Sequence, residues 1–115
     1  MGQNVGFDRV VFDISGPLPA YRVEYVPVVR EDPTGNPIAL AGNADILVTL
    51  QPTNWTVTPS PRVNLTPGFP ALRQVRSAGE FEAIASYGIG QATKAGLRAF
   101  TLTNPNRVVV DVRHP

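Results

Sequence analysis

The sequence predicts an all-β domain, built as a single β-sandwich or a flattened barrel of short, mostly antiparallel strands. Three observations support this fold class. Segments that alternate apolar and polar residues recur along the chain, as strands with one buried face do. The 115 residues include 12 prolines and 10 glycines, which indicates short elements joined by many turns. The chain also lacks the recurring helical segments that connect parallel strands.

The first half of the chain contains four predicted strands. Residues 7–14 and 21–26 both alternate apolar with charged side chains, so each strand has one buried and one wet face. Pro27 should place the end of the second strand at an edge or a bulge, because proline cannot donate to a ladder. Residues 38–40 and 46–50 are mainly aliphatic and predict two further strands. The apolar face of the first strand consists of Val10, Phe12 and Ile14.

The second half begins with a stretch that lacks clean periodicity. Residues 51–70 include five prolines, so we expect a long surface loop from which Trp55 and Val57 can contact the core. Residues 98–102 and 107–112 are rich in β-branched and other apolar side chains and predict two strands separated by a proline-containing turn. The last of these segments is the clearest strand of the chain.

Residues 80–87 fit two structures. Ser77 and Glu80 match a capping box, which predicts the start of a helix. Apolar side chains also recur at every second position, as in a strand, and Gly88 is expected to end the segment. Because isolated short helices are marginal in water, we favour the strand. A single helical turn is expected between residues 91 and 96.

The two clearest strands, residues 9–14 and 107–112, share a pattern: arginine, two valines, an apolar residue, aspartate and another apolar residue. The pattern fits two sheet strands with one wet face each, or related strands in a pseudo-symmetric sandwich. If the strands are neighbours, an antiparallel pairing sets Arg9 opposite Asp111 and Arg107 opposite Asp13. A parallel pairing sets arginine beside arginine, so charge predicts the antiparallel register.

Composition and charge exclude several classes of function. The net charge is +1 and the basic residues form no run, which argues against nucleic-acid binding. The chain has no cysteine, and therefore no disulfide, thiol nucleophile or thiolate metal site. Its single histidine, His114, is penultimate, where a frayed terminus is expected rather than a catalytic or metal-binding cleft. The nine carboxylates mostly alternate with apolar residues, as solvated positions do. We therefore predict no enzyme activity and no cofactor or metal.

Aromatic side chains come closest to a binding signal. Their faces pack well on the apolar faces of sugar rings, but buried aromatic residues can equally fill the core of a sandwich. Both interpretations stay open, and Trp55 is the best exposed candidate because it lies in the predicted loop. The residues concerned are Tyr21, Tyr25, Trp55, Phe69 and Tyr87.

Four stretches of the sequence resemble, in the family's order, the AMIN-like domain of actinobacterial lipoproteins. They are residues 6–13, 21–26, 79–82 together with 87–90, and 102–112. Each stretch alone is only a strand with a turn, whereas the four in order are specific. The resemblance covers nearly the whole chain, which implies that residues 1–115 form one AMIN-like β-sandwich domain.

The resemblance also implies a place and a role. It implies an extracytoplasmic domain of the cell envelope, on a full-length protein whose lipid-anchored cysteine and flexible linker lie upstream of this sequence. Related AMIN domains accompany peptidoglycan amidases and secretin channels, where they localise the partner by binding the wall. We therefore expect a non-catalytic targeting module that recognises peptidoglycan or another wall glycan. The alternatives are a domain that docks an envelope enzyme or secretion component by a strand edge, and a lipid carrier.

If the ligand is a wall glycan, aromatic stacking and arginine–carboxylate hydrogen bonds should hold it. We expect these contacts from Trp55, Tyr87, Arg73 and Arg76. A strand would place the two arginines on opposite faces, whereas a turn could bring them together.

Overall fold

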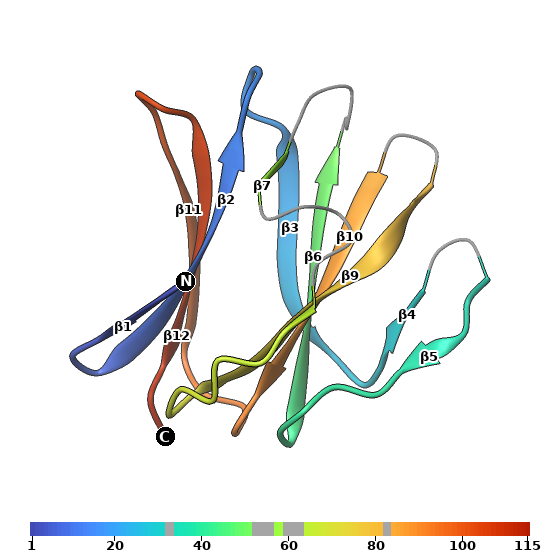
Figure 1. Ribbon diagram of the computed structural model, residues 1–115, viewed down its shortest axis with the longest axis vertical. Helices are drawn as coiled ribbons and strands as arrows, with labels where there is room; N and C mark the ends of the chain where they lie inside the picture. Colours follow the sequence, from blue (N-terminus) through green and yellow to red (C-terminus); the bar gives the residue numbers. More distant parts are fainter. Residues whose placement is uncertain (32–33, 52–56, 59–63, 82–83) are drawn as a thin grey trace.

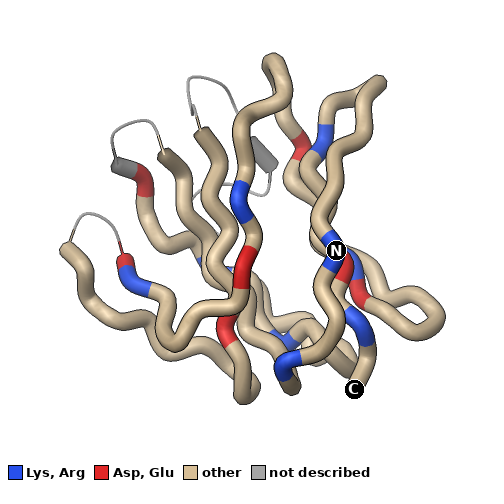
Figure 2. Tube along the Cα trace, turned by 180° about the vertical axis from the view of Figure 1, so that it is seen from behind, with Lys and Arg blue, Asp and Glu red and all other residues tan. Residues whose placement is uncertain are grey.

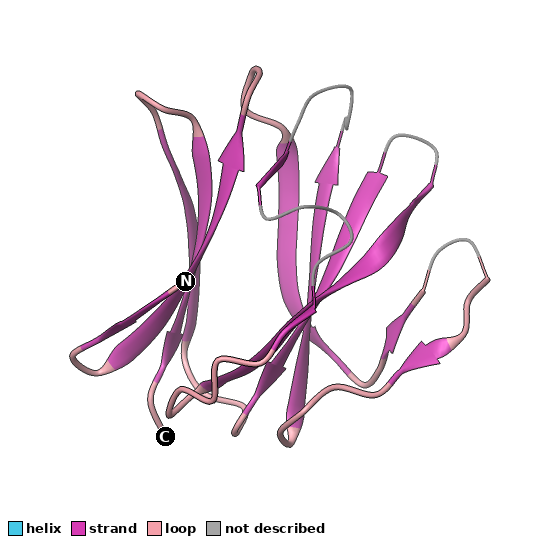
Figure 3. Cartoon of the chain, in the orientation of Figure 1, coloured by secondary structure: helices cyan, strands magenta, loops and turns pink. Residues whose placement is uncertain are grey.

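Two antiparallel sheets face each other in the computed structural model, and a small hairpin lies outside the second sheet (Figure 1). The structure describes residues 1–31, 34–51, 57–58, 64–81 and 84–115. Within these residues every regular element is a strand, as Figure 3 shows. The predicted all-β fold of antiparallel strands is therefore confirmed. Each sheet pairs only within itself, so the fold is an open sandwich and not a closed barrel.

Sheet A joins the beginning and the end of the chain. Its strands are β1 (Gly2–Asn4), β2 (Phe7–Ile14), β7 (Val57–Thr58), β11 (Leu97–Leu102) and β12 (Arg107–Arg113). The order is β1-β2-β12-β11, and β7 also pairs with β2. β2 and β12 are antiparallel neighbours, with Arg9 opposite Asp111 and Arg107 opposite Asp13. This is the register that charge pairing predicts.

Sheet B consists of strands from the middle of the chain, in the order β3-β6-β10-β9-β8. They are β3 (Ala20–Val26), β6 (Ala44–Gln51), β8 (Asn64–Leu65), β9 (Leu72–Phe81) and β10 (Ile84–Gln91). Two of these, β3 and β6, coincide with predicted strands. The predicted loop over residues 51–70 is wrong in part, because β7 and β8 lie within it; Trp55 falls outside the described residues.

The core lies between the two sheets and follows the period-two patterns of the sequence. Val10, Phe12 and Ile14 are buried on the inner face of β2, as predicted. The same cluster contains alternate residues of β12, which neighbours β2, and of β6 and β10 in the facing sheet. The rings of Phe12 and Tyr87 meet across the sheets with centroids 4.8 Å apart. The buried partners from β12, β6 and β10 are Val108, Val110, Val112, Ile46, Val48, Leu50, Ala85, Tyr87 and Ile89.

The described residues of the segment 80–87 are extended, but they belong to two strands. β9 ends at Phe81 and β10 begins at Ile84, so the two strands form a hairpin within this segment. The prediction that Gly88 ends the strand is wrong, because β10 continues to Gln91. Residues 92–94 form a bend, and the helical turn expected between residues 91 and 96 is not formed.

The glycines of β10 allow another part of the chain to cross the outer face of sheet B. A Cβ on Gly88 would lie 3.0 Å from Leu40 Cδ1, and one on Gly90 would overlap the carbonyl oxygen of Ala41. Glycine inside a strand permits such a close backbone approach. The crossing segment follows the hairpin of β4 (Val29–Arg30) and β5 (Pro37–Ile38), which packs its apolar side chains on this outer face. Sheet B is therefore covered on both sides.

One buried carboxylate forms hydrogen bonds that connect the two sheets. Asp8 in β2 is fully buried, and its Oδ2 accepts hydrogen bonds from the backbone N–H groups of Ala71 at 2.8 Å and Leu72 at 3.0 Å. Its Oδ1 lies 2.8 Å from Nε2 of His114. Asp8 is therefore an exception to the expectation that the carboxylates are mostly solvated, and the expectation of a frayed His114 is wrong, because its side chain is half-buried. Position in β2 explains the exception, because Asp8 lies on the same face as Val10.

Candidate functional site

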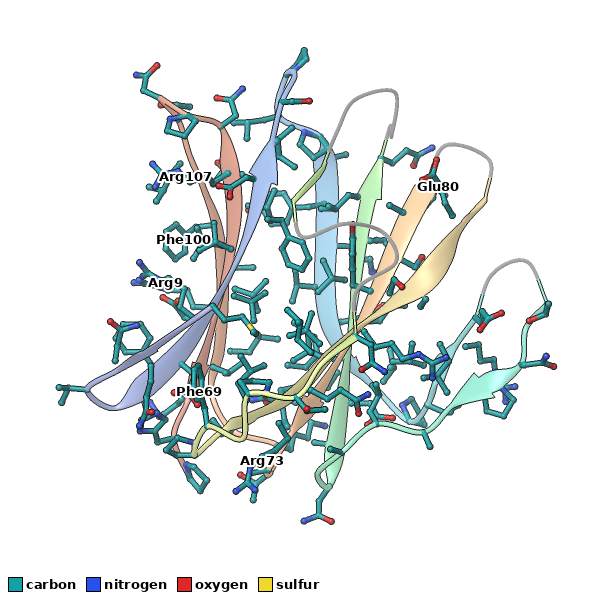
Figure 4. All side chains as sticks on the ribbon, viewed as in Figure 1. Arg9, Phe69, Arg73, Glu80, Phe100 and Arg107 are labelled. Carbon is teal, nitrogen blue, oxygen red and sulfur yellow. The ribbon has the colours of Figure 1, made fainter. Side chains whose placement is uncertain are left out.

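The outer face of sheet A is a charged surface built by neighbouring strands. Side chains that alternate with the core residues project from it along β2, β12 and β11. Figure 4 shows three of them, Arg9, Phe100 and Arg107, pointing away from sheet B. We call this surface the arginine face, and it comprises Phe7, Arg9, Asp13, Arg98, Phe100, Arg107, Asp111 and Arg113.

The arginine face concentrates positive charge on a nearly neutral chain. Four arginines against two aspartates give it a formal charge of +2, whereas the whole chain carries +1. Figure 2 shows these blue and red positions on the sheet that carries both chain ends. The β4–β5 hairpin covers the outer face of sheet B, but the elements that the structure describes leave the outer face of sheet A open to solvent.

An ion pair between neighbouring strands lies at the centre of the face. Arg9 Nε donates to Asp111 Oδ1 at 2.7 Å, and Arg9 Nη2 donates to Asp111 Oδ2 at 2.9 Å. Arg98 Nη2 donates to the same Oδ2 at 3.3 Å. The hydrogen bonds that Arg9 donates to Asp111 raise the pKa of the Arg9 guanidinium, so Arg9 stays charged. Only 8% of the Asp111 side chain is exposed, and both of its oxygens accept hydrogen bonds from Arg9.

Two phenylalanine rings hold the guanidinium groups of the face in place. The guanidinium carbon of Arg9 lies 5.5 Å from the ring centroids of both Phe7 and Phe100. The guanidinium carbon of Arg98 lies 4.7 Å from the Phe100 centroid. Cations are attracted to the negative faces of aromatic rings. The Phe100 ring therefore contacts both guanidinium groups, which also share the carboxylate of Asp111.

The second predicted cross-strand ion pair is not formed, although the register places its partners opposite each other. The Arg107 guanidinium donates to the backbone oxygens of Pro105 at 3.0 Å and Thr103 at 3.4 Å. The turn between β11 and β12 supplies these acceptors close to Arg107, while Asp13 is exposed to water. Local carbonyl groups thus compete successfully with a solvated carboxylate.

A pocket of about 570 Å³ lies at one end of the arginine face. Three segments that are distant in the sequence surround it: the β1–β2 turn, the start of β11 and the end of β12. Its lining includes Val5, Phe7, Leu97, Arg98, Asp111 and Arg113. Pockets of this volume accommodate small ligands or the ends of larger ones. Basic groups and apolar walls together suit an anion that carries a small apolar group.

The structure does not bring the four sequence-predicted binding residues together. Tyr87 is fully buried in the core, so its ring is not available for stacking on a ligand. Burial, followed by the charge of Glu80, raises the pKa of its hydroxyl group to about 12. Arg76 lies in β9 opposite Gly88, on the outer face of sheet B. Arg73 is exposed near the start of β9, and Figure 4 shows it apart from Arg9, Phe100 and Arg107. Trp55 lies outside the described residues.

Sequence reasoning missed Arg98, Phe100 and Arg113 as candidates. Their strands were predicted, and the alternation with buried valines already placed the arginines and aspartates of β2 and β12 on a wet face. What the sequence did not contain is the order β2-β12-β11, which sets Arg98 and Phe100 beside them.

The described residues hold no group of three or more histidine, cysteine, aspartate or glutamate side chains that could bind a metal ion. Among the same residues, no helix is long and apolar enough to cross a bilayer.

The family model of the AMIN-like domain matches residues 1–114. No curated protein and no solved structure matches the chain significantly. The family match covers almost every residue, including all the strands that form the arginine face. The chain therefore belongs to the AMIN-like domain family and is a module related to the cell envelope.

Proposed function

We propose that the chain is a non-catalytic binding module that recognises peptidoglycan or another anionic wall glycan through its arginine face. The observation that supports this most directly is the open surface of sheet A, where ordered guanidinium groups and phenylalanine rings lie side by side. We further propose that the domain acts outside the cytoplasmic membrane on a lipid-anchored protein. A lipid-modified cysteine upstream of the domain in the full-length protein would test that placement.

The chemistry of the wall matches the chemistry of this face. Peptidoglycan carries carboxylates on its peptide stems, and an arginine fork binds a carboxylate through two parallel hydrogen bonds. Sugar rings present apolar faces that pack on aromatic side chains. Arg98 and Arg113 are exposed, and Phe100 is half-buried beneath Arg98, so both kinds of contact are available on one surface.

The absence of catalysis is part of the proposal. General acid–base chemistry requires a side chain that can reach a substrate with its titrating atom. The chain has one histidine, and Nε2 of His114 is occupied by Asp8 at 2.8 Å. The Asp111 oxygens are likewise held by Arg9 and Arg98. These groups support the fold, and binding remains the function that the surface suits.

A docking function is the second candidate, because sheet B ends in an open strand. Among the described strands β3 pairs only with β6, and its other edge has no neighbour. Ala20, Tyr21 and Arg22 at the start of β3 are exposed, and Tyr21 is 39% exposed. A partner strand could add to this edge by backbone hydrogen bonds. Such a module would not need the arginine face.

Sedimentation with purified cell wall tests the proposed function. We expect the wild-type domain to sediment with the wall, and the triple variant Arg98→Ala, Arg107→Ala, Arg113→Ala to bind at least about tenfold more weakly. The matched control removes the same charge from other exposed positions, by Arg22→Ala, Arg30→Ala and Arg73→Ala. The control should bind like the wild type.

Two results would overturn the proposal. Equal loss of binding in both triple variants would show that net charge and not the arginine face is responsible. A wild-type domain that stays in the supernatant would refute wall binding and would favour docking through β3. Thermal unfolding of each variant shows whether the fold is retained.

A further inference from the structure

We infer that the pocket at the end of the arginine face binds the free carboxylate that ends a short peptide with small apolar side chains. This inference rests on the proposed function and names the part of the wall that is recognised: the peptide stem rather than the sugar. It assigns the pocket to Val5, Phe7, Leu97, Arg98 and Arg113, with Asp111 as the residue that positions Arg98.

The positions of the charges favour an incoming carboxylate. Arg9 donates to both oxygens of Asp111, so the negative charge of Asp111 is already balanced within the protein. Arg98 makes one longer contact to Asp111, at 3.3 Å, and 70% of its side chain is exposed. A guanidinium has five N–H donors, so most of those of Arg98 are available. Arg113 lines the same pocket, and no ion pair of Arg113 occurs among the described residues.

Preorganisation reduces the entropic cost of binding at this pocket. Phe100 lies beneath the Arg98 guanidinium at 4.7 Å, and Asp111 holds one of its nitrogens. A side chain that is already ordered loses less rotamer freedom when a ligand binds. The pocket therefore presents a planar donor fork in a fixed position, which matches a planar carboxylate.

The remaining walls of the pocket set the size and polarity of the ligand. Val5 at the tip of the β1–β2 turn lines the pocket and is 99% exposed, so its side chain is available to a ligand. Phe7 forms the adjacent apolar wall, and Leu97 also lines the pocket, although its side chain packs against the core between the sheets. Apolar walls suit a methyl-bearing residue next to the carboxylate, whereas a strongly hydrated phosphate would leave them without a partner.

The test is an NMR titration of the wild-type domain with four probes. They are N-acetyl-D-alanyl-D-alanine, the same dipeptide as its C-terminal amide, N-acetylglucosamine and inorganic phosphate. We expect the free dipeptide to shift the backbone amides of Val5, Gly6, Gly96 and Arg98, and the amide to bind at least about tenfold more weakly. Arg98→Gln and Arg113→Gln should each weaken dipeptide binding, while Arg73→Gln, an exposed arginine outside the pocket, should leave it unchanged.

Several results would overturn the inference: equal binding of the free dipeptide and its amide, shifts confined to other parts of the chain, or tighter binding of phosphate or of the sugar. Sedimentation with glycan from which the peptide stems have been removed separates this inference from the proposed function. Binding to stem-free glycan would refute stem recognition and leave wall binding intact. Loss of binding to intact wall as well would refute both.

Discussion

The carboxylate of Asp111 accepts two hydrogen bonds from the guanidinium of Arg9, although 102 positions separate the two residues in the chain. The contact joins the first and last long strands of the domain in the middle of sheet A. Asp111 also accepts a hydrogen bond from Arg98, and the Phe100 ring contacts both arginines. This cross-strand pair favours the observed register of β2 on β12 and lies at the centre of the surface that we propose to bind the wall.

A double-mutant cycle should detect this pair and should not detect its counterpart. We expect Arg9→Ala and Asp111→Ala to show a coupling of about 1 kcal/mol in urea unfolding, because the pair is bidentate and partly buried. The control cycle, Arg107→Ala with Asp13→Ala, occupies the equivalent register position without the ion pair. Its coupling should stay below about 0.3 kcal/mol. Equal couplings would contradict the view that geometry rather than register gives the stability.

Removal of the buried carboxylate should destabilise the domain strongly. Asp8→Ala leaves the N–H groups of Ala71 and Leu72 buried without an acceptor, and each such group costs about 1–3 kcal/mol. We expect a loss of about 3 kcal/mol or more in the free energy of unfolding. Asp13→Ala in the same strand removes an exposed carboxylate and should change stability by less than about 0.5 kcal/mol.

The lowered pKa of Asp8 predicts how the free energy of unfolding depends on pH. Burial raises its pKa, but the hydrogen bonds from Leu72, His114 and Ala71 outweigh burial, and the net pKa is lowered. A lowered pKa in the folded state stabilises the protein above the unfolded value of about 3.9, and that stabilisation is lost as the pH falls through the folded pKa. The free energy of unfolding, measured from roughly pH 6 down to roughly pH 2, should show this loss. In Asp8→Ala the dependence of that free energy on pH should be weaker. If the variant lost as much stability at low pH as the wild type, other carboxylates would be responsible for the loss.

Gly90 should tolerate no side chain, in contrast to Gly2. A Cβ on Gly90 would overlap the carbonyl oxygen of Ala41, where the chain crosses sheet B, whereas nothing lies within 4 Å of a Cβ on Gly2. We expect Gly90→Ala to cost about 1–3 kcal/mol, because backbone must move, and Gly2→Ala to be nearly neutral. Thermal unfolding compares the two. Equal melting temperatures would mean that the crossing segment is not packed on β10.

Gln91 is a buried polar side chain whose replacement should stabilise the domain. It is fully buried at the end of β10, and neither its amide nitrogen nor its amide oxygen has a hydrogen-bond partner among the described residues. Methionine of similar volume removes both unpaired groups, so we expect Gln91→Met to add about 1 kcal/mol in urea unfolding. Gln74→Met is the control, because that amide bonds Ala41 and Asn64 and its loss should destabilise. A destabilised Gln91→Met would indicate a bound water at the site.

The fold should not depend on a metal ion or a disulfide. The chain has no cysteine, and the described residues contain no metal-binding cluster. We expect thermal unfolding curves with and without a chelator, and with and without a reductant, to coincide. A lower melting temperature in the chelator would mean that a metal contributes to stability.

The sequence alone determined which residues of β2 face inward. In a strand successive side chains point to opposite faces whatever the strand pairs with, so the alternation around Val10 and Phe12 is sufficient to place them. The arginine and aspartate pattern also predicted the register that β2 and β12 adopt as neighbours, because opposite charges face each other only in the antiparallel pairing. Both inferences use periodicity and charge, which are local properties of the chain.

Only the tertiary structure decided which of the alternating residues lie in the core and which lie on the candidate binding surface. Tyr87 alternates like an exposed candidate, but it lies opposite Phe12, and only the facing of the two sheets buries it. Asp8 lies on the core-facing side of β2, but the N–H groups that donate to its carboxylate belong to residues more than 60 positions away in the chain. The pocket likewise needs three distant segments at once. Contacts of this kind depend on strand order and sheet packing, and residue spacing carries no information about either.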